Sequence, residues 1–364
     1  MSVPLLTFAV LSIVAPKDGA TVPTLRDGQK AYLEEKRTER FVRMDNPADR
    51  AKLFAFGSTQ KPLRIEWSGE TNAVYALAVS AEGGRTDQFV LTNRTNAYLT
   101  NLELGKTYRW TVRREGTEDS VSASFTTEAE PPRLLRAGGV SNFRDLGGWR
   151  TADGKRVREN MIFRSAGLRS SSKSTGSFLR RTVVLGDRRV TADGIAALRD
   201  DFRIRTDLEL RTPQETAGMT GTLLGTNVNW RCISFAAYDF IDNSVRGREP
   251  FAKIFEIFTK KENYPVLMHC SGGRDRTGTL AFLLNGLLGV DEDDLCRDWE
   301  TSVFSDQGMK FNSGSIQRLL DYLKMMPGET FQARVESYAR GCGISDAEIA
   351  AFRSIMCESA AEAK

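Results

Sequence analysis

The chain is built around the stretch YPVLMHCSGGRDRTG, which occupies residues 264–278. An apolar run, YPVLM, begins it, and a longer one, TLAFLLNGLL at residues 279–288, follows it. A short apolar run predicts a buried strand, and a long one predicts a buried helix. Residues 269–278 therefore lie on a strand-to-helix turn, where backbone N–H groups and the helix N-terminus favour a bound anion. We expect a loop that holds phosphate.

The spacing inside this loop indicates the chemistry. Five residues separate Cys270 from Arg276, which lets the sulfur lie beneath a phosphorus atom while the guanidinium forks onto two phosphate oxygens. A cysteine at a helix N-terminus beside arginines is favoured as a thiolate, the nucleophilic form. We expect Thr277 to hydrogen-bond the sulfur and His269 to brace the loop. The expected phosphate-binding set is Ser271, Gly272, Gly273, Arg274, Asp275, Arg276 and Thr277.

Three segments carry a family resemblance. Residues 269–277 resemble the His-Cys-x-x-Gly-x-x-Arg-Ser/Thr signature of the cysteine-dependent protein tyrosine phosphatases. The segments NFRDLGG at 142–148 and IFRSA at 162–166 narrow the resemblance to a bacterial branch with tyrosine, dual-specificity and phosphoinositide phosphatases. The resemblance covers residues 137–364. It implies an α/β fold, with a central sheet flanked by helices, and chemistry without a cofactor.

Several charged residues near the loop are expected to support it. Strand-end arginines beside a phosphate loop usually pin it, so we interpret Arg144, Asp145 and Arg164 as members of structural ion pairs rather than as substrate ligands. The segment TDLELRTPQE at 206–215 is similar to a strand of the same branch that ends in Asp-Leu-Arg, but Glu209 stands where Asp is usual. We expect Glu209 to brace the loop with an arginine partner, and a catalytic role is the alternative.

The reaction also needs a proton donor for the leaving oxygen. Asp275 lies inside the loop and resembles the Asp of the branch's Lys-Asp-Arg-Thr, with Arg274 in place of the Lys. Asp239 lies 31 residues before the nucleophile, as the acid does in dual-specificity enzymes. Both stay open as the general acid, and Asp242 and Glu209 are further alternatives.

Composition limits the classes of protein. With 364 residues, 40% hydrophobic and 27% charged, the chain suits a globular protein of two domains. The net charge of +4 comes without a basic tract, so we expect no nucleic-acid partner. A single histidine disfavours a histidine-rich metal phosphatase, so we expect no metal. The cysteines have no zinc or disulfide spacing: Cys232, Cys270, Cys296, Cys342 and Cys357.

The region before the loop domain has the character of a β-sandwich. Six short alternating segments with Gly- and Asn-containing turns predict strands, at 63–67, 73–79, 88–91, 97–99, 107–112 and 121–125. LELGKTYRW at 102–110 resembles fibronectin type III domains, with Tyr108 as the corner tyrosine. The prolines in EAEPPR at 128–133 mark a boundary. We therefore expect a sandwich over 1–130, with a helical insertion at about 26–60, and a catalytic domain over 131–364.

The remaining segments, near the two ends of the chain, carry no catalytic motif. Val3 to Val14 is apolar but lacks preceding Lys or Arg, which favours a first strand over a signal peptide. Arg26 to Arg50 is charged and sparsely apolar, which predicts surface helices. Acidic residues from Asp291 and a capping box at Ser345 to Glu348 predict two later helices. Family resemblance implies export to the periplasm, and a chain without a signal would be cytoplasmic.

Together these observations predict a metal-independent phosphomonoester hydrolase that acts through a phosphocysteine. A protein tyrosine or dual-specificity phosphatase is the first interpretation, and a phosphoinositide phosphatase is the second. A phosphate-binding docking protein without activity is the alternative of another class. The expected partners are a phosphorylated protein or phosphoinositide and a protein or surface that contacts the sandwich, and we expect no transmembrane segment.

Overall fold

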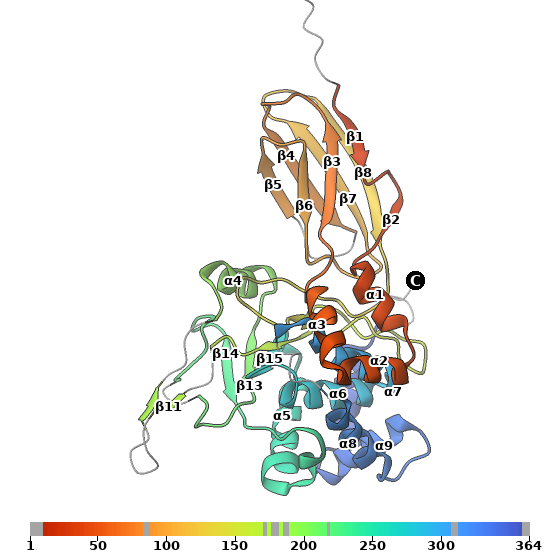
Figure 1. Ribbon diagram of the computed structural model, residues 1–364. Coiled ribbons are helices and arrows are strands. Elements are labelled where there is room, and N and C mark those ends of the chain that lie inside the picture. Colours follow the sequence, from red (N-terminus) through yellow and green to blue (C-terminus); the bar gives the residue numbers. More distant parts are fainter. Residues whose placement is uncertain are drawn as a thin grey trace, which may run out of the picture. The chain divides into compact units, whose positions relative to one another are not determined.

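The computed structural model describes residues 10–82, 88–169, 173–175, 182–184, 189–216, 219–306 and 312–358. The chain forms two compact units (Figure 1). Unit 1 comprises Met1–Arg26 and Gln60–Glu130, and unit 2 comprises Asp27–Thr59 and Pro131–Lys364. The segment that we expected as an insertion in the sandwich, about 26–60, thus groups with the catalytic region rather than with the strands around it.

Unit 1 contains two sheets that share one core. The first has the order β1 (Ser12–Ala15), β3 (Leu63–Ser68), β6 (Asn96–Leu99). The second has the order β2 (Ala20–Val22), β8 (Ser120–Thr127), β7 (Thr107–Arg114), β4 (Tyr75–Ala81), β5 (Gln88–Thr92). All six strands predicted between 63 and 125 are present, because alternation places one face of each strand in the core around Trp67 and Trp110. Of the predicted strand from Val3 to Val14, residues 3–9 lie outside the described residues.

Unit 2 is built on a five-stranded sheet with the order β14 (Asn229–Cys232), β13 (Thr206–Glu209), β15 (Val266–Cys270), β10 (Ile162–Ala166), β9 (Arg144–Asp145). The first four strands are parallel and β9 is antiparallel to β10. Every residue of β15 is buried, which is why its sequence is a continuous apolar run. Parallel strands end at the same edge of a sheet, so β10, β13 and β15 bring distant residues together at the carboxyl end of β15.

Helices and short segments complete unit 2 (Figure 1). The helix α6 (Arg276–Leu288) follows β15 directly, and twelve of its thirteen residues are buried, as the apolar run predicts. The expected N-caps Asp291 and Ser345 begin α7 and α10. The remaining elements are α4 (Ala192–Ala196), η1 (Ala197–Asp201), η2 (Tyr238–Asp242), η3 (Ser244–Arg248), α5 (Glu249–Phe258), η4 (Lys261–Asn263), α7 (Glu292–Glu300), η5 (Thr301–Phe304), α8 (Ser313–Lys324), α9 (Phe331–Gly341), α10 (Asp346–Met356) and the hairpin β11 (Lys173–Thr175) and β12 (Thr182–Val184).

Three helices lie between β2 and β3 of unit 1 in sequence but belong to unit 2: α1 (Asp27–Glu34), α2 (Arg37–Asp45) and α3 (Pro47–Ala55). The prediction of helices is confirmed, and most of their residues are exposed or half-buried, as expected of helices at the surface. Each helix nevertheless buries one face. Tyr32, Arg40, Met44 and Leu53 have no exposed surface. The sparse apolar residues did not indicate this buried face, because a tyrosine, a methionine and an arginine contribute much of it.

Among the residues that the structure describes, no helix has the length and apolar character that crossing a bilayer requires.

Candidate active site

The loop between β15 and α6 is held from outside through its carbonyl groups. Asn142 Nδ2 donates to Gly272 O at 3.0 Å, and Arg164 Nη2 donates to Gly273 O at 2.8 Å. The backbone N–H of Gly167 donates to Ser271 O at 3.2 Å. In a trans peptide the C=O and the following N–H point in opposite directions. Three consecutive N–H groups therefore turn toward the inside of the loop, the arrangement that binds an anion.

Gly273 is required by this geometry. Its φ is +66°, and a Cβ at this position would lie 2.2 Å from the carbonyl oxygen of Ser165 at the end of β10. Any side chain would therefore push the loop away from the sheet. The glycine keeps the loop close enough for Arg164, on the same strand, to reach its carbonyl.

A buried carboxylate organises the residues that hold the loop. Asp298 on α7 binds Arg144 Nε at 3.0 Å and also binds Arg164 Nη1, and its side chain is 6% exposed. Although burial alone would raise the pKa of Asp298, Arg164 and Arg144 hold it below its usual value. Arg144 also donates to Asn142 Oδ1 at 2.6 Å. The NFRD and FRS segments thus meet at one carboxylate beneath the loop.

Asp145, the fourth residue of the NFRD segment, lies in a separate ion pair. Its side chain accepts from Arg133 Nη1 at 3.0 Å and from the backbone N–H groups of Gly147 at 2.8 Å and Asn160 at 2.7 Å. Burial raises the pKa of Asp145 above its usual value. Its contacts fix the turns before and after β9 rather than the loop itself.

A second buried cluster lies beside Cys270. His269 Nε2 donates to Asp207 Oδ1 at 2.6 Å, and its Nδ1 lies 3.4 Å from Glu209 Oε2. Arg211 Nε and Nη2 bind the two oxygens of Glu209 at 2.9 and 2.6 Å. Although burial alone would lower it, the charges of Glu209 and Asp207 raise the pKa of His269 to about 9. The imidazolium is therefore the main form at neutral pH and carries positive charge next to Cys270.

Arg276 has a carboxylate partner that the sequence analysis did not single out. Its Nη1 and Nη2 bind Glu215 Oε2 and Oε1 at 2.6 and 2.8 Å. Ser271 Oγ donates to the same carboxylate at 3.1 Å. Hydrogen bonding by Arg276 lowers the pKa of Glu215 to about 2. The one sequence signal was the Thr212-Pro-Gln-Glu215 spacing, in which Glu215 accepts from the backbone N–H of Thr212 at 3.0 Å.

The candidate proton donors are both paired with arginine. Asp275 binds Arg274 through both oxygens, at 2.9 and 3.0 Å, and accepts a hydrogen bond from the hydroxyl of Tyr238. Asp239, next to that tyrosine on η2, binds Arg318 of α8 at 3.2 Å. Burial raises the pKa of Tyr238 well above its usual value. The hydroxyl therefore stays protonated and donates a hydrogen bond to Asp275.

Asp242, the further candidate, lies at the end of η2. It accepts from the hydroxyl of Tyr322 at 2.7 Å and from Arg248 Nη2 at 2.6 Å. The hydroxyl of Tyr322 lowers the pKa of Asp242, followed by Arg248. These contacts tie the carboxylate to α8 and η3 rather than to the loop.

The candidate nucleophile is enclosed. Cys270 is 2% exposed. The hydroxyl of Thr277 is buried and has no hydrogen-bond partner within the described part of the chain. All five cysteines are free thiols, and Cys232 is exposed at the end of β14.

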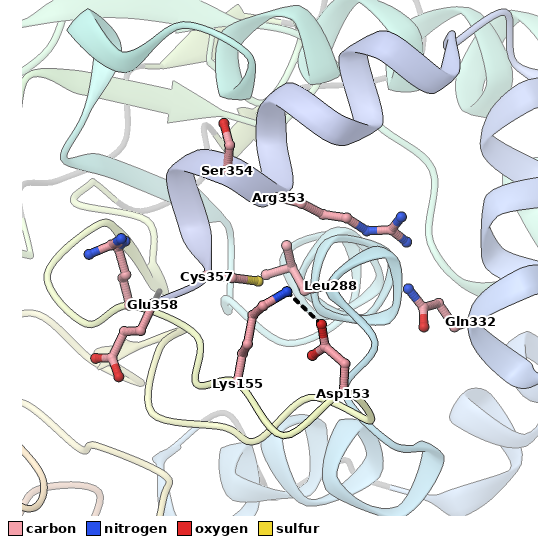
Figure 2. Close-up of a pocket in the computed structure, with 9 residues that line it drawn as sticks. Asp153, Lys155, Leu288, Gln332, Arg353, Ser354, Cys357 and Glu358 are labelled. Carbon is pink, nitrogen blue, oxygen red and sulfur yellow. Dashed lines mark hydrogen bonds and ion pairs between the residues drawn. The ribbon is translucent and has the colours of Figure 1, made fainter. Parts of the chain in front are cut away.

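A cavity of about 520 Å³ lies elsewhere in unit 2. Figure 2 shows it around Leu288 at the C-terminal end of α6, with the ion pair of Lys155 and Asp153 on one side and Cys357 beside it. The thirteen residues of α6 rise about 1.5 Å each, so this cavity is about 18 Å from the Cys270 loop. It is separate from the Cys270 loop, where we predicted phosphate binding.

Comparison with known proteins identifies the class. The model of the tyrosine phosphatase family matches residues 135–185 and 186–358, which is more than half of the chain, so the protein belongs to this family. A protein of Cupriavidus necator named "putative tyrosine-protein phosphatase" is 28% identical over 199 residues, which span 50% of this chain and 66% of that protein. The chain is therefore a member of the tyrosine phosphatase family with a mixed α/β fold, and it spans just under two thirds of the length of this relative.

A solved structure was also found among the similar proteins. It is the core catalytic domain of the PP-IP phosphatase SIW14 from S. cerevisiae in complex with citrate, with 19% identity, a TM-score of 0.28, and coverage of 44% of this chain and 80% of that chain. Similarity at this level carries no conclusion about substrate.

Proposed function

We propose that this protein hydrolyses phosphomonoesters of tyrosine, or of tyrosine and serine or threonine, in proteins, without a metal. The sulfur of Cys270 attacks phosphorus, an S–P bond forms, and the P–O bond to the alcohol breaks as the leaving oxygen takes a proton from Asp275. Water then attacks phosphorus and gives a proton to Asp275. The S–P bond breaks, and phosphate and the thiolate are released.

The observation that carries this proposal is the orientation of the loop around Cys270. Its carbonyls at 271, 272 and 273 are bound from outside, so its amides face the site and stabilise charge on the equatorial oxygens. Arg276 is placed to stabilise charge on the same phosphate oxygens. Glu215 occupies the end of the guanidinium formed by Nη1 and Nη2, and the side formed by Nε and Nη2 is the edge that can fork onto phosphate.

We assign the proton transfer to Asp275 rather than to Asp239. Asp275 is part of the loop and is fixed by Arg274 and by the hydroxyl of Tyr238. Asp239 faces α8, where its partner Arg318 also lies 5.8 Å above the ring of Tyr238. Asp275 thus belongs to the loop that would hold the phosphate, whereas Asp239 is paired with an arginine that lies over Tyr238.

A phosphoinositide is the second candidate substrate. Two arginines support it, Arg274 inside the loop and Arg189, whose Nη1 donates to Ser271 O at 3.2 Å. Both place positive charge near the loop, where further phosphate groups of an inositol ring could bind.

The test is release of inorganic phosphate in the presence of a chelator. The substrates are a phosphotyrosine peptide, a phosphoserine peptide and phosphoinositide vesicles, and the variants are Cys270→Ser and, as a matched control, Cys232→Ser. We expect release to vanish in Cys270→Ser and to remain in Cys232→Ser, and the preferred substrate decides between protein and lipid. Absence of release by the wild type from every substrate would support the alternative of a phosphate-binding docking protein.

The proton donor has its own test. Asp275→Asn is expected to reduce kcat by about 100-fold for phenyl phosphate, a poor leaving group, and much less for p-nitrophenyl phosphate, which leaves without protonation. Asp239→Asn is the matched control. The reverse ranking of the two variants would assign the proton transfer to Asp239.

For unit 1 we propose a fibronectin type III-like sandwich that contacts a protein or a surface. Supporting this, the hydroxyl of Tyr108 accepts from the backbone N–H of Glu103 at 2.8 Å, the contact of a corner tyrosine. We also propose, from family resemblance, that the protein acts in the periplasm. Fractionation of cells that produce the full-length protein tests this, and recovery in the cytoplasm alone would contradict it.

A further inference from the structure

The helices α1, α2 and α3 lie within residues 27–59, which we call the N-terminal helical segment. It lies outside residues 135–358, which match the family, and 60–130 separate the two regions in sequence. In space the segment packs on α7 and η5, as Figure 1 shows for α2 and α7. Tyr32 meets Phe304 edge to face at 5.6 Å, and Arg297 Nε donates to Leu33 O at 3.0 Å.

The centre of this contact is a buried ion pair. Arg40 on α2 binds Glu300 on α7 at 2.7 Å, and neither side chain is exposed. The same guanidinium donates to Asp293 at 2.8 Å and to the carbonyl of Glu35 at 2.5 Å. Tyr32 donates its hydroxyl to Glu300 at 3.1 Å. A guanidinium with this many fixed partners sets the position of α7 closely.

The element fixed by Arg40 is the one that holds the phosphate loop. Asp298 lies two residues before Glu300 on α7 and binds Arg164, which donates to Gly273 O. Ser302 lies two residues after it, and its hydroxyl accepts from Asn142, which donates to Gly272 O. Both side chains that pin the loop carbonyls thus depend on residues within two positions of Glu300.

We propose that Arg40 is a positioning residue for the Cys270 loop, and that the N-terminal helical segment is part of the catalytic apparatus of this phosphatase. The proposal rests on the proposed function of that loop. Arg40 touches no reacting atom. It holds Glu300, and through the backbone of α7 and η5 it fixes Asp298 and Ser302 at the distance from which Arg164 and Asn142 orient the loop amides.

The experiment compares two arginines of α2 in the full-length protein. Arg40→Met removes the buried pair. Arg37→Met is the matched control, because Arg37 binds Glu292 of the same α7 at 2.7 Å but is one third exposed, at 34%. For each variant, kcat and KM for p-nitrophenyl phosphate and the inhibition constant of vanadate are measured at least about 15 °C below the Tm of that variant. Glu300→Gln, which keeps the shape of the side chain, is measured as well.

We expect Arg40→Met to lower kcat by about 10- to 100-fold and to weaken vanadate binding, because a small displacement of loop amides has effects of this size. Arg37→Met is expected to stay within about twofold of the wild type in both. Glu300→Gln should change kcat in the same direction as Arg40→Met, and it carries the test if Arg40→Met does not fold.

A lower Tm with unchanged kcat and unchanged vanadate affinity in Arg40→Met or Glu300→Gln would overturn the proposal, because the pair would then support only the fold. Failure of the proposed function is distinguishable. In that case the wild type itself would release no phosphate, or Cys270→Ser would be as active as the wild type.

Discussion

Two sides of the same loop are built from ion pairs, but in different surroundings. On the buried side, Asp298 pairs with Arg144 and Arg164, and no side chain of these three is more than 6% exposed. On the open side, the side chains of Arg276 and Glu215 are 20% and 28% exposed. Water and salt weaken a pair of the second kind, whereas a buried charge that loses its partner cannot be solvated.

The buried ion pairs hold the loop in shape, whereas the open ion pairs have to change partners during the reaction. The buried pairs fix the carbonyls of the loop and have no path to a substrate. The open pairs involve Arg276 and Asp275, the groups proposed to contact phosphate and the leaving oxygen, and such contacts have to change within one turnover. We therefore expect substitutions on the buried side to cause large losses in the free energy of unfolding. Substitutions on the open side should cause smaller effects, mainly on kcat and kcat/KM.

The largest effect is expected from Asp298→Asn. This change leaves two buried guanidinium groups without a counter-charge, so we expect a loss of about 3–5 kcal/mol in the free energy of unfolding, measured by urea denaturation. Asp200→Asn is the control, because Asp200 pairs with Arg199 and both are more than half exposed. This control variant should leave the free energy of unfolding almost unchanged, because the exposed pair is screened by water and salt. Equal losses in the two variants would remove the distinction between buried and exposed pairs.

The next prediction concerns His269 and the change of stability with pH. The pKa of His269 is about 9 in the folded protein and 6.5 ordinarily, so its stabilisation is fully present below pH 6.5 and is lost as pH rises through 9. The full contribution is on the order of 3 kcal/mol. We expect the urea midpoint of the wild type to fall between about pH 6 and pH 10, and to fall less in His269→Asn.

Glu215, on the open side, should behave in the opposite sense. Its pKa is about 2 in the folded protein and 4.5 ordinarily. Its contribution to stability is therefore present above pH 4.5 and is lost as pH falls through 2.

The histidine prediction has a contrary outcome. If the urea midpoint falls equally with pH in the wild type and in His269→Asn at alkaline pH, the buried histidine is not ionised at neutral pH.

Much of the fold was predictable because local patterns determine it. The alternation in residues 63–125 gave six strands, and the apolar runs around Cys270 gave β15 and α6. The helices of the N-terminal helical segment were predicted, but the burial of Arg40 was not. Its burial depends on Glu300, 260 positions away, and no local pattern announces such a pairing.

The site shows the same limit. Cys270, Arg276 and the loop could be predicted because their spacing lies within one short stretch. Glu215 was missed, because its role depends on a loop after β13 reaching Arg276, 61 residues further along. The partner of Glu209 was predicted only as an arginine, and Arg211 occupies that place two residues later.

Glu215→Gln tests the open side with a moderate effect. The amide keeps the shape but weakens the charge-assisted bonds that orient Arg276, so we expect kcat/KM for p-nitrophenyl phosphate to fall by about tenfold, or about 1.4 kcal/mol. The urea midpoint should change little because the pair is partly exposed. Tighter binding of vanadate in Glu215→Gln would contradict this, since it would mean that the carboxylate competes with phosphate for Arg276.

The smallest effect is expected from Arg318→Gln at the outer edge of the open side. Arg318 and Asp239 are 50% and 39% exposed, so their ion pair should contribute less than about 0.5 kcal/mol to stability. The guanidinium also lies over the ring of Tyr238, and that contact is worth about as little at an exposed site. Because Tyr238 keeps its bonds to Thr279 and Asp275, kcat should stay within about twofold of the wild type. A loss of kcat as large as that in Asp275→Asn would show that the positions of Tyr238 and of Asp275 depend on this exposed pair. The ion pairs on the open side would then fix the geometry of the loop as the buried pairs do, and the distinction between the two sides would not hold.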